Sequence, residues 1–468
     1  MRGTIGGIPG ENLTPIDIVE MAAAFGQLIK TKHRNPSVVI GRDARVSGSM
    51  VAELCAQTLI AQGFHVYNAG LSTTPTIEMA VTDLKASAGI IVTASHNPGQ
   101  WNALKFLNDK GEFISAEEGQ QLIKTANDRS YNFNEVDQLG SLAQVDGLIQ
   151  KHIEHIFNLP LVDAHLVASR KYKVVVDCIN STGTISIKPI LEQLGCDVIL
   201  INEEMTGLFA HNPEPLLQHL TELCEKVIAE KADLGIAVDP DVDRLSFICS
   251  DGTLLGEENT LVAIAQYILK NTPGATVSNL SSTRGLRDVT VSAGQNYFAA
   301  AVGEVNVVTK MKEVNAVIGG EGNGGIIYPE LHYGRDALVG VALMLTYMAK
   351  ENITILDLKN ALPQYSISKN KIDLEKSWNV RSAIDRLIEI YENEEVNTED
   401  GLKIDFESGW VQLRQSNTEP IIRVYSESNT MEAAEKLAND IIAKFKEMVK
   451  YNYFIKIVSY QQKCFQNV

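Results

Sequence analysis

The chain has 468 residues, which is more than one hydrophobic core normally organises, so we expect about three or four domains. Hydrophobic residues make up 45% of the chain and charged residues 21%, which excludes a disordered or fibrous protein. The formal net charge of -17 argues against nucleic acid and anionic membranes as partners, because both select for clustered Lys and Arg.

Short β-branched runs alternate with helical patterns along the chain. The predicted strands are Ser37 to Ile40, Gly89 to Thr93, Lys173 to Val176, Asp233 to Val238 and Ala316 to Gly319. The predicted helices are Pro15 to Lys30, Ser49 to Gln62, Pro215 to Lys231, Asn259 to Leu269 and Met431 to Val449. This alternation predicts α/β domains with largely parallel sheets.

Composition changes along the chain predict where the domains end. We expect a first domain at residues 1–150, a second at 151–254, a third at 255–364 and a fourth at 365–450. Residues 451–468 form an aromatic and basic tail with no clean helical or strand period, so no structure or role is assigned to them.

The cysteines and the apolar runs indicate the cellular compartment in which we expect the protein. Six cysteines are scattered without a Cys-x-x-Cys pair, so their spacing suggests neither a zinc site nor a disulfide framework. No basic segment followed by an apolar stretch opens the chain, and the longest mainly apolar run, Ala337 to Ala349, is too short to span a bilayer. That run predicts a buried helix, and we expect a cytoplasmic protein with reduced thiols.

The first motif is a serine in a strand-to-loop turn. The apolar run from Ala88 ends in a polar turn that holds Ser95 and His96, and ligands of α/β sheets bind beyond the carboxyl ends of strands. Pro98 favours one fixed loop shape, and Lys105 is near enough in sequence to reach the serine or a phosphate on it. A plain turn is the alternative for this motif alone, and no Gly-x-Ser-x-Gly elbow indicates an acyl-transfer hydrolase.

The second motif is a set of three aspartates at every second position after an apolar strand. If the extended backbone continues, Asp239, Asp241 and Asp243 lie on one side. Like charges about 4 Å apart repel by about 4 kcal/mol per pair at an effective dielectric near 20, so such a cluster needs a cation or protonation. Mg²⁺ suits an all-oxygen site that also holds phosphate. Arg244 follows directly and is placed to hold a phosphate oxygen or to restrain the carboxylates.

Two further motifs can contact a ligand. The run Gly319-Gly-Glu-Gly-Asn-Gly-Gly325 lets the backbone approach a ligand closely, while Glu321 and Asn323 supply groups that suit hydroxyl recognition. A turn near the C-terminus combines two guanidinium groups with hydroxyl and amide donors, which match the oxygens of a phosphate. This turn contains Arg414, Ser416, Asn417, Thr418 and Arg423. A plain turn is the alternative for both motifs.

Together these four motifs resemble the α-D-phosphohexomutase family. The motifs that carry the resemblance are Thr93-Ala-Ser-His-Asn-Pro98, Asp239-Pro-Asp-Val-Asp-Arg244, Gly320-Glu-Gly-Asn-Gly324 and Arg414-Gln-Ser-Asn-Thr-Glu-Pro420. Their order and spacing cover nearly the whole chain, and Ile40-Gly-Arg-Asp-Ala-Arg45 is a lesser match. The resemblance implies four domains around a central cleft: three related α/β domains with mixed sheets, followed by a smaller C-terminal α+β domain.

The resemblance also implies a role for each site residue. Ser95 is expected to be the phosphoserine, and the three aspartates are expected to bind one Mg²⁺ per chain together with Ser95. Arg2, His96, Lys105 and Arg244 match positions near the transferring phosphate, with Lys105 preferred for proton transfer. Glu321 and Asn323 are expected to bind the sugar. The C-terminal turn, Arg414, Ser416, Asn417, Thr418 and Arg423, is expected to hold the phosphate that does not react.

Three departures from the family pattern affect these expectations. Many members have Ser and His where this chain has Asn323 and Gly325, so a sugar-contacting histidine is absent from this loop. The chain starts at Met1-Arg2, so we expect the first sheet to lack an edge strand and Arg2 to be poorly held. The tail after Val449 matches nothing in the family.

The function predicted from these motifs is interconversion of hexose 1-phosphate and hexose 6-phosphate through a phosphoserine and a hexose 1,6-bisphosphate, which is also expected to be the activator. The loop composition favours glucosamine phosphate, with glucose and mannose phosphates as alternatives. A haloacid-dehalogenase-like phosphatase and a noncatalytic sugar-phosphate sensor are the rival functions. The expected partner is a phosphorylated hexose rather than nucleic acid or membrane, and the expected state is a monomer or homodimer.

Overall fold

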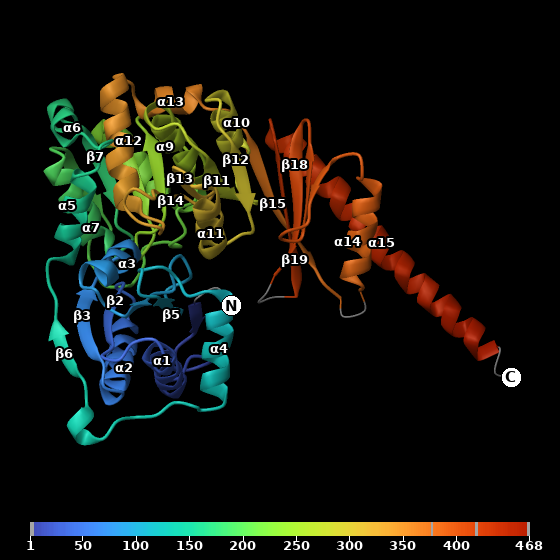
Figure 1. The fold of residues 1–468 in the computed structure, drawn as a ribbon. Helices are drawn as coiled ribbons and strands as arrows, with labels where there is room; N and C mark the ends of the chain where they lie inside the picture. Colours follow the sequence, from blue (N-terminus) through green and yellow to red (C-terminus); the bar gives the residue numbers. More distant parts are fainter. Residues whose placement is uncertain (1–3, 376–377, 417–419, 466–468) are drawn as a thin grey trace. The chain divides into compact units, whose positions relative to one another are not determined.

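The structure is a computed structural model that describes residues 4–375, 378–416 and 420–465. Four β-sheets follow one another along the chain (Figure 1). The chain divides into two compact units: the first contains Met1–Ser278, Leu286–Phe298 and Gly303–Leu362, and the second contains Asn279–Gly285, Ala299–Val302 and Pro363–Val468.

The first sheet of the first unit has six strands in the order β1-β5-β4-β2-β3-β6. Its strands are β1 (Thr4–Gly7), β2 (Ser37–Arg42), β3 (His65–Leu71), β4 (Ala88–Val92), β5 (Asn102–Leu107) and β6 (Ser141–Gln144). Its helices are α1 (Pro15–Lys30), α2 (Gly48–Ala61), α3 (Thr74–Asp83) and α4 (Ala116–Asn127). Strands β4, β2, β3 and β6 are parallel, whereas β5 runs antiparallel to both β1 and β4. The expectation that this sheet lacks an edge strand is wrong, because β1 forms that edge.

Local sequence determines where α1 begins. Thr14 caps this helix: its hydroxyl accepts from the backbone of Asp17, while the Asp17 side chain accepts from the backbone of Thr14. Pro15 at the first turn has no amide proton to leave unsatisfied. The buried β4 consists of apolar residues and glycine, as expected for a strand covered on both faces.

The second sheet has four strands in the order β10-β9-β7-β8. Its strands are β7 (Lys173–Asp177), β8 (Asp197–Ile201), β9 (Leu234–Val238) and β10 (Leu245–Cys249). The helices of this region are α5 (Leu148–Phe157), α6 (Ala164–Arg170), α7 (Gly183–Gln193) and α8 (Thr221–Glu230). The predicted helix over Pro215 to Lys231 is wrong in its first part. Pro215 and Leu216 precede a short 3₁₀ turn (Leu217–His219), because the carbonyl of Pro215 instead accepts a hydrogen bond from Ser246.

The third sheet has four strands in the order β12-β11-β13-β14. Its strands are β11 (Thr276–Asn279), β12 (Tyr297–Ala300), β13 (Ile318–Glu321) and β14 (Gly325–Ile327). The helices are α9 (Glu257–Asn271), α10 (Gly285–Ser292), α11 (Glu304–Val314), α12 (Ala337–Glu351) and α13 (Ile355–Ala361). The run Ala337 to Ala349 is buried throughout in α12, which confirms the predicted buried helix. One hydrophobic cluster extends from α5 to α13 and joins the second and third sheets.

The second unit has a five-stranded sheet in the order β15-β19-β18-β17-β16, and all its strand pairs are antiparallel. Its strands are β15 (Ser366–Asp373), β16 (Glu395–Asn397), β17 (Leu402–Phe406), β18 (Gly409–Gln415) and β19 (Ile421–Ser428). Two helices, α14 (Val380–Ile390) and α15 (Met431–Phe465), accompany them. Helix α15 continues to Phe465, so most of the tail that the sequence left unassigned is helical.

These sheets confirm the predicted fold class, with mixed α/β sheets in three regions and a smaller antiparallel α+β region at the C-terminus. The five cysteines whose side chains are described are free. Within the described residues no single helix has the length and apolar composition to cross a membrane. The pair α12 and α13, bent by 88°, passes that test together, and α12 is a buried core helix.

Candidate active site

Ser95 lies in the turn that follows β4. Its backbone has φ of 49°, a left-handed conformation that is uncommon for a residue with a side chain. The Ser95 amide donates to Thr93 Oγ1 at 2.9 Å, and the hydroxyl donates to Asp239 Oδ2 at 2.7 Å. The structure therefore brings together the first two motifs of the sequence, which are 144 positions apart.

A buried arginine holds this turn in place. Arg45 is 1% exposed, and its guanidinium donates to the carbonyl oxygens of Ser95, Asn97, Pro98 and Trp101. Its Nε donates to Asp43 Oδ2 at 3.0 Å. Sequence analysis noted the run that contains Arg45 only as a lesser match. Arg45 follows a predicted strand by a few residues, and this position was the feature of the sequence that could have indicated a role in the site.

The three aspartates converge, but not by the predicted extended backbone. Strand β9 ends at Val238, and the chain turns so that Val242 has φ of 61°, an outlier for a β-branched residue. All three carboxyl groups are fully buried, and one ligand oxygen from each lies within 4.8 Å of the others. The prediction of a shared carboxylate cluster is confirmed, whereas the predicted extended strand through Asp239, Asp241 and Asp243 is wrong.

The carboxylate cluster has the donor set of a metal site. Asp239 Oδ1 accepts from the backbone amides of Asp243 and Arg244, both at 3.1 Å. In contrast, Asp241 Oδ1 and Asp243 Oδ1 are buried without a hydrogen-bond partner among the described residues. Buried acceptors without a partner cost free energy. Hard oxygen atoms in this arrangement can hold a divalent cation, so these residues fit a metal ion.

Lys105 extends from β5 to the same cluster. Its Nζ lies 2.6 Å from Asp241 Oδ2 and 3.2 Å from Asp243 Oδ2. Burial alone would lower the pKa of Lys105, but the two carboxylates outweigh burial and raise that pKa. Lys105 is therefore positively charged in this state. Thr74, which the sequence analysis did not select, also donates to Asp241 Oδ2 from the start of α3.

His96 and Arg244 also lie near Ser95. His96 Nδ1 is 3.5 Å from Ser95 Oγ, and its Nε2 accepts from Arg244 at 3.4 Å. Burial, assisted by the positive charge of Arg244, lowers the pKa of His96 to about 2, so this imidazole is neutral. Ser95, His96, Lys105 and Arg244 line a pocket of about 310 Å³.

Arg335, another residue that the sequence analysis missed, links the aspartates to the glycine-rich loop at residues 319–325. Its guanidinium donates to Asp243 at 2.7 Å and to Glu304 and Glu321 at 2.9 Å. Its position just before α12 gave no signal, because its partners come from distant segments. Glu321 Oε1 also accepts from the amide of Gly303 at 2.9 Å.

Asn323 closes the turn of this glycine-rich loop by accepting from the amide of Gly325 at 3.2 Å. At Gly324, with φ of 85°, an added Cβ would lie 2.3 Å from the carbonyl oxygen of Leu245. The glycine therefore lets the turn between β13 and β14 lie against Leu245 at the start of β10, whose amide donates to the Gly324 carbonyl at 3.1 Å. The roles of Glu321 and Asn323 in sugar binding stay predictions.

The predicted phosphate turn lies in the second unit. Arg414 and Arg423 are paired directly across β18 and β19, and the amide of Ser416 donates to the carbonyl of Ile421 at 3.0 Å. Arg414 Nη1 lies 3.9 Å from Asp400 Oδ2, and the two guanidinium groups remain candidates for binding an anion. Asn417, Thr418 and Arg2 lie outside the described residues.

Comparisons with known proteins agree with this geometry. Four family models match in succession: phosphoglucomutase/phosphomannomutase domain I at residues 1–132, domain II at 150–252, domain III at 257–365 and the C-terminal domain at 374–444. A phosphoglucomutase/phosphomannomutase of Thermococcus kodakarensis is 34% identical over 96% of this chain and 99% of that protein. A phosphoglucosamine/phosphogalactosamine mutase of Sulfurisphaera tokodaii is 32% identical over 95% of this chain and 97% of that protein.

A solved structure gives the same result. The crystal structure of a phosphoglucomutase/phosphomannomutase family protein from Burkholderia thailandensis has a TM-score of 0.85 and 25% sequence identity, and the match covers 96% of each chain. Both the sequence matches and this structure extend over nearly the full chain rather than over one motif. The chain therefore belongs to the phosphoglucomutase/phosphomannomutase family of phosphohexomutases.

Proposed function

We propose that this chain interconverts hexose 1-phosphate and hexose 6-phosphate through a phosphorylated Ser95 and a hexose 1,6-bisphosphate. The observation that carries this proposal is the 2.7 Å hydrogen bond from Ser95 Oγ to Asp239, next to two buried carboxylate oxygens without hydrogen-bond partners in the described part of the chain. Such a serine can store a phosphoryl group beside a cation. The names of the two relatives support the same class of reaction.

The metal in this proposal is one Mg²⁺ per chain, held by Asp239, Asp241, Asp243 and the phosphoryl group on Ser95. When bound, Mg²⁺ offsets the charge of that phosphoryl group, which is about −1.5 to −2 near neutral pH. Lys105 and Arg335 supply further positive charge, because both contact the carboxylates directly. They also hold the carboxylates in position.

The transfer step exchanges one phosphorus–oxygen bond for another. A sugar hydroxyl attacks the phosphorus on Ser95, the bond to Oγ breaks, and the products are the sugar bisphosphate and a free serine hydroxyl. We assign Lys105 to proton transfer, in which it protonates Ser95 Oγ and recovers a proton from the attacking hydroxyl. Neutral His96 accepts from Arg244 and orients that guanidinium towards the transferred group.

The bisphosphate must then turn over, so that its other phosphate returns to Ser95. A phosphate site that accepts either end of the sugar is needed for this, and the C-terminal turn is our candidate for it. Its residues in this role are Arg414, Ser416, Asn417, Thr418 and Arg423. Hexose 1,6-bisphosphate acts as activator because it can phosphorylate a free Ser95 and leave as a monophosphate.

The sugar is proposed to be glucosamine phosphate, with glucose and mannose phosphates as the alternatives. Asn323 and Gly325 occupy the positions at which many members have Ser and His. One relative is named for glucosamine and galactosamine and the other for glucose and mannose, so both groups of substrate belong in the test. Conversion rates measured for the three hexose phosphates at equal concentration decide between them.

The deciding experiment replaces Ser95 with alanine and compares it with a matched variant, Ser87→Ala. Ser87 is a buried serine just before β4, and its hydroxyl accepts from the amide of Ser37. We expect Ser95→Ala to lose nearly all turnover and to lose the phosphorylated species in intact-mass spectra, whereas Ser87→Ala keeps both. Normal mutase rates in Ser95→Ala, or phosphate mapped to another residue, would remove Ser95 from its role.

The same assay tests the two rival functions. A phosphatase would release inorganic phosphate from the sugar and leave Ser95 unmodified. A sensor would bind the sugar phosphate without converting it, and would carry no phosphoserine after treatment with hexose 1,6-bisphosphate. Mutase product without stoichiometric phosphate release excludes both.

A further inference from the structure

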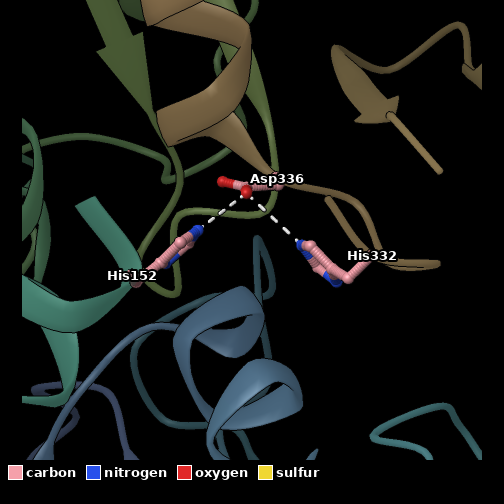
Figure 2. A group of neighbouring side chains, drawn as sticks. All are labelled: His152, His332 and Asp336. Atoms are coloured by element: carbon pink, nitrogen blue, oxygen red, sulfur yellow. Dashed lines mark hydrogen bonds and ion pairs between the residues drawn. The ribbon is translucent and has the colours of Figure 1, made fainter. Parts of the chain in front are cut away.

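Two histidines and an aspartate meet at the start of α12, and the reaction proposed above uses none of them. His152 comes from α5, His332 from the loop after β14, and Asp336 is the N-cap residue of α12. Figure 2 shows both imidazole rings pointing at one carboxylate oxygen of Asp336. The distances to Asp336 Oδ2 are 2.9 Å from His152 Nε2 and 3.3 Å from His332 Nε2.

The 3.3 Å separation matches that between two ligands of a tetrahedral metal ion, and the 2.9 Å separation is shorter, as in a hydrogen bond that an ion would replace. Two donor atoms bound to Zn²⁺ at about 2.0–2.1 Å lie about 3.3–3.4 Å apart in a tetrahedral site. One donor atom from each of the three residues lies within 4.8 Å of the others. His152 and Asp336 are buried, and His332 is partly exposed, so the cluster can be reached from one side.

The remaining polar atom of each residue is held in the way that metal ligands usually are. His152 Nδ1 is 3.0 Å from Thr76 Oγ1. Asp336 Oδ1 accepts from the amides of Leu338 and Val339, which leaves Oδ2 facing the two rings. A hydrogen bond at the far nitrogen fixes the orientation of a histidine ligand and raises its basicity. The donor atoms of His152 and Asp336 are therefore fixed in direction before any ion binds.

A buried carboxylate provides an independent indication of a ligand. Glu78 on α3 is 1% exposed, and neither of its oxygens has a hydrogen bond among the described residues. Its Oε2 lies 3.4 Å from His332 Nδ1. If His332 Nε2 binds a cation, its Nδ1–H points at Glu78 and forms the carboxylate–histidine–metal arrangement that is common at zinc sites.

The route to the cluster is a pocket of about 470 Å³ that both Glu78 and His332 line. Four carboxylate residues and one lysine line this pocket: Glu78, Asp83, Glu112, Glu330 and Lys110. This excess of negative charge favours the entry of cations. The pocket also leaves one side of the three-ligand cluster open to solvent or to a further ligand.

We propose that His152, His332 and Asp336 form a second metal site, which binds a divalent first-row transition ion and is best matched by Zn²⁺. Imidazole nitrogens select such ions over Mg²⁺, whereas the all-oxygen aspartate cluster has the opposite preference. The ion would join α5 to the start of α12, and through Thr76 and Glu78 it would also fix α3. The ion would thus connect segments of all three α/β regions.

The test uses the full chain, stripped of metal and then saturated with Mg²⁺, and titrates it with Zn²⁺ by calorimetry. We expect one Zn²⁺ per chain, and the same stoichiometry in Asp241→Asn, which disables the aspartate cluster. We expect His332→Gln to weaken Zn²⁺ binding by at least about 10- to 100-fold. His155→Gln is the matched control: His155 lines the same pocket and pairs with Asp83 at 3.2 Å, and we expect unchanged affinity.

Three results would overturn the proposal: no Zn²⁺ binding in the presence of Mg²⁺, equal affinity in His332→Gln, or equal losses in His332→Gln and His155→Gln. The first would mean that the cluster is only a hydrogen-bonded ion pair. If circular dichroism shows that the His332→Gln variant misfolds, the absorption spectrum of Co²⁺ bound to the unaltered chain takes the place of the comparison between variants. Tetrahedral bands without sulfur charge transfer support the site, whereas octahedral or thiolate spectra refute it.

Discussion

Replacing Arg45 with methionine should damage both the stability of the first α/β region and the chemistry at Ser95. The guanidinium of Arg45 donates to four carbonyl oxygens of the loop from Ser95 to Trp101 and is anchored by Asp43. It also lies over the ring of Phe209, at 5.0 Å from the ring centroid. Methionine keeps much of the volume but none of these hydrogen bonds.

The loss of unfolding free energy can be estimated from the buried groups that lose their partner in Arg45→Met. Asp43 is fully buried, and removing one partner of a buried ion pair costs about 3–5 kcal/mol. The orphaned carbonyls add to this cost wherever water cannot reach them. Because a domain is typically stable by about 5–15 kcal/mol, Arg45→Met removes a large share of that stability. A shift of about 1 Å in Ser95 would lower turnover by about 100-fold.

Urea unfolding and mutase turnover measure the two effects separately, and the fluorescence of Trp101 reports on the loop itself. Arg42→Met is the control, because half-buried Arg42 donates to the Asp43 backbone carbonyl at 3.0 Å. We expect that control to lose at most about 1.5 kcal/mol. Wild-type turnover in a folded Arg45→Met enzyme would show that the loop does not depend on Arg45 and would refute this reasoning.

Three further predictions concern the metal, Arg335 and pH. Removing metal with a chelator should abolish turnover, and added Mg²⁺ should restore it. The Asp241→Asn variant should need more Mg²⁺ to reach the same rate. Turnover that persists in the presence of chelator would contradict the metal assignment. The Arg335→Met variant should lower the free energy of urea unfolding of the first unit by about 3–5 kcal/mol. The reason is that it leaves Asp243, Glu304 and Glu321 without the guanidinium that they share. An unchanged unfolding midpoint would argue against that linkage. Burial lowers the pKa of His211, but its 2.8 Å contact with Asp177 outweighs burial and raises that pKa. The contact should therefore stabilise the fold fully below the ordinary histidine pKa of about 6.5. This stabilisation should be lost as the pH rises through the raised pKa. Unfolding at pH 6 and pH 8 should therefore differ more in the wild-type chain than in His211→Gln, and equal differences would refute the assignment.

Sequence patterns predicted elements well where the signal was local. Helix α1 occupies the predicted residues because Thr14, Pro15 and Asp17 specify its start. The predicted start of α8 at Pro215 failed because a tertiary contact, from Ser246 to the Pro215 carbonyl, outweighs the local preference for a helix start at proline. The end of α15 was also missed, since residues after Val449 lack the periodicity on which the prediction depends.

Site residues were predictable where a motif placed them after a strand, as for Ser95 and the three aspartates. Arg335 was not, because its partners Asp243, Glu304 and Glu321 lie on separate segments that only the packed fold brings together. The cluster of His152, His332 and Asp336 was hidden for the same reason. No pattern of spacing along the chain marks these three residues as metal ligands.

The left-handed Val242 explains why the aspartate motif came with an incorrect backbone prediction, and Ser95, correctly predicted in a turn, has the same unusual conformation. Ser95 and Val242 both have positive φ, which costs about 1–3 kcal/mol at each position. Extended backbone at either position would direct the side chains of the motif along a strand instead of towards each other. The strain is offset by buried contacts on each side: Arg45 holds the serine turn, and the amides of Asp243 and Arg244 hold Asp239. The hydroxyl and the carboxylates therefore meet only because surrounding residues stabilise two conformations that local sequence preferences oppose.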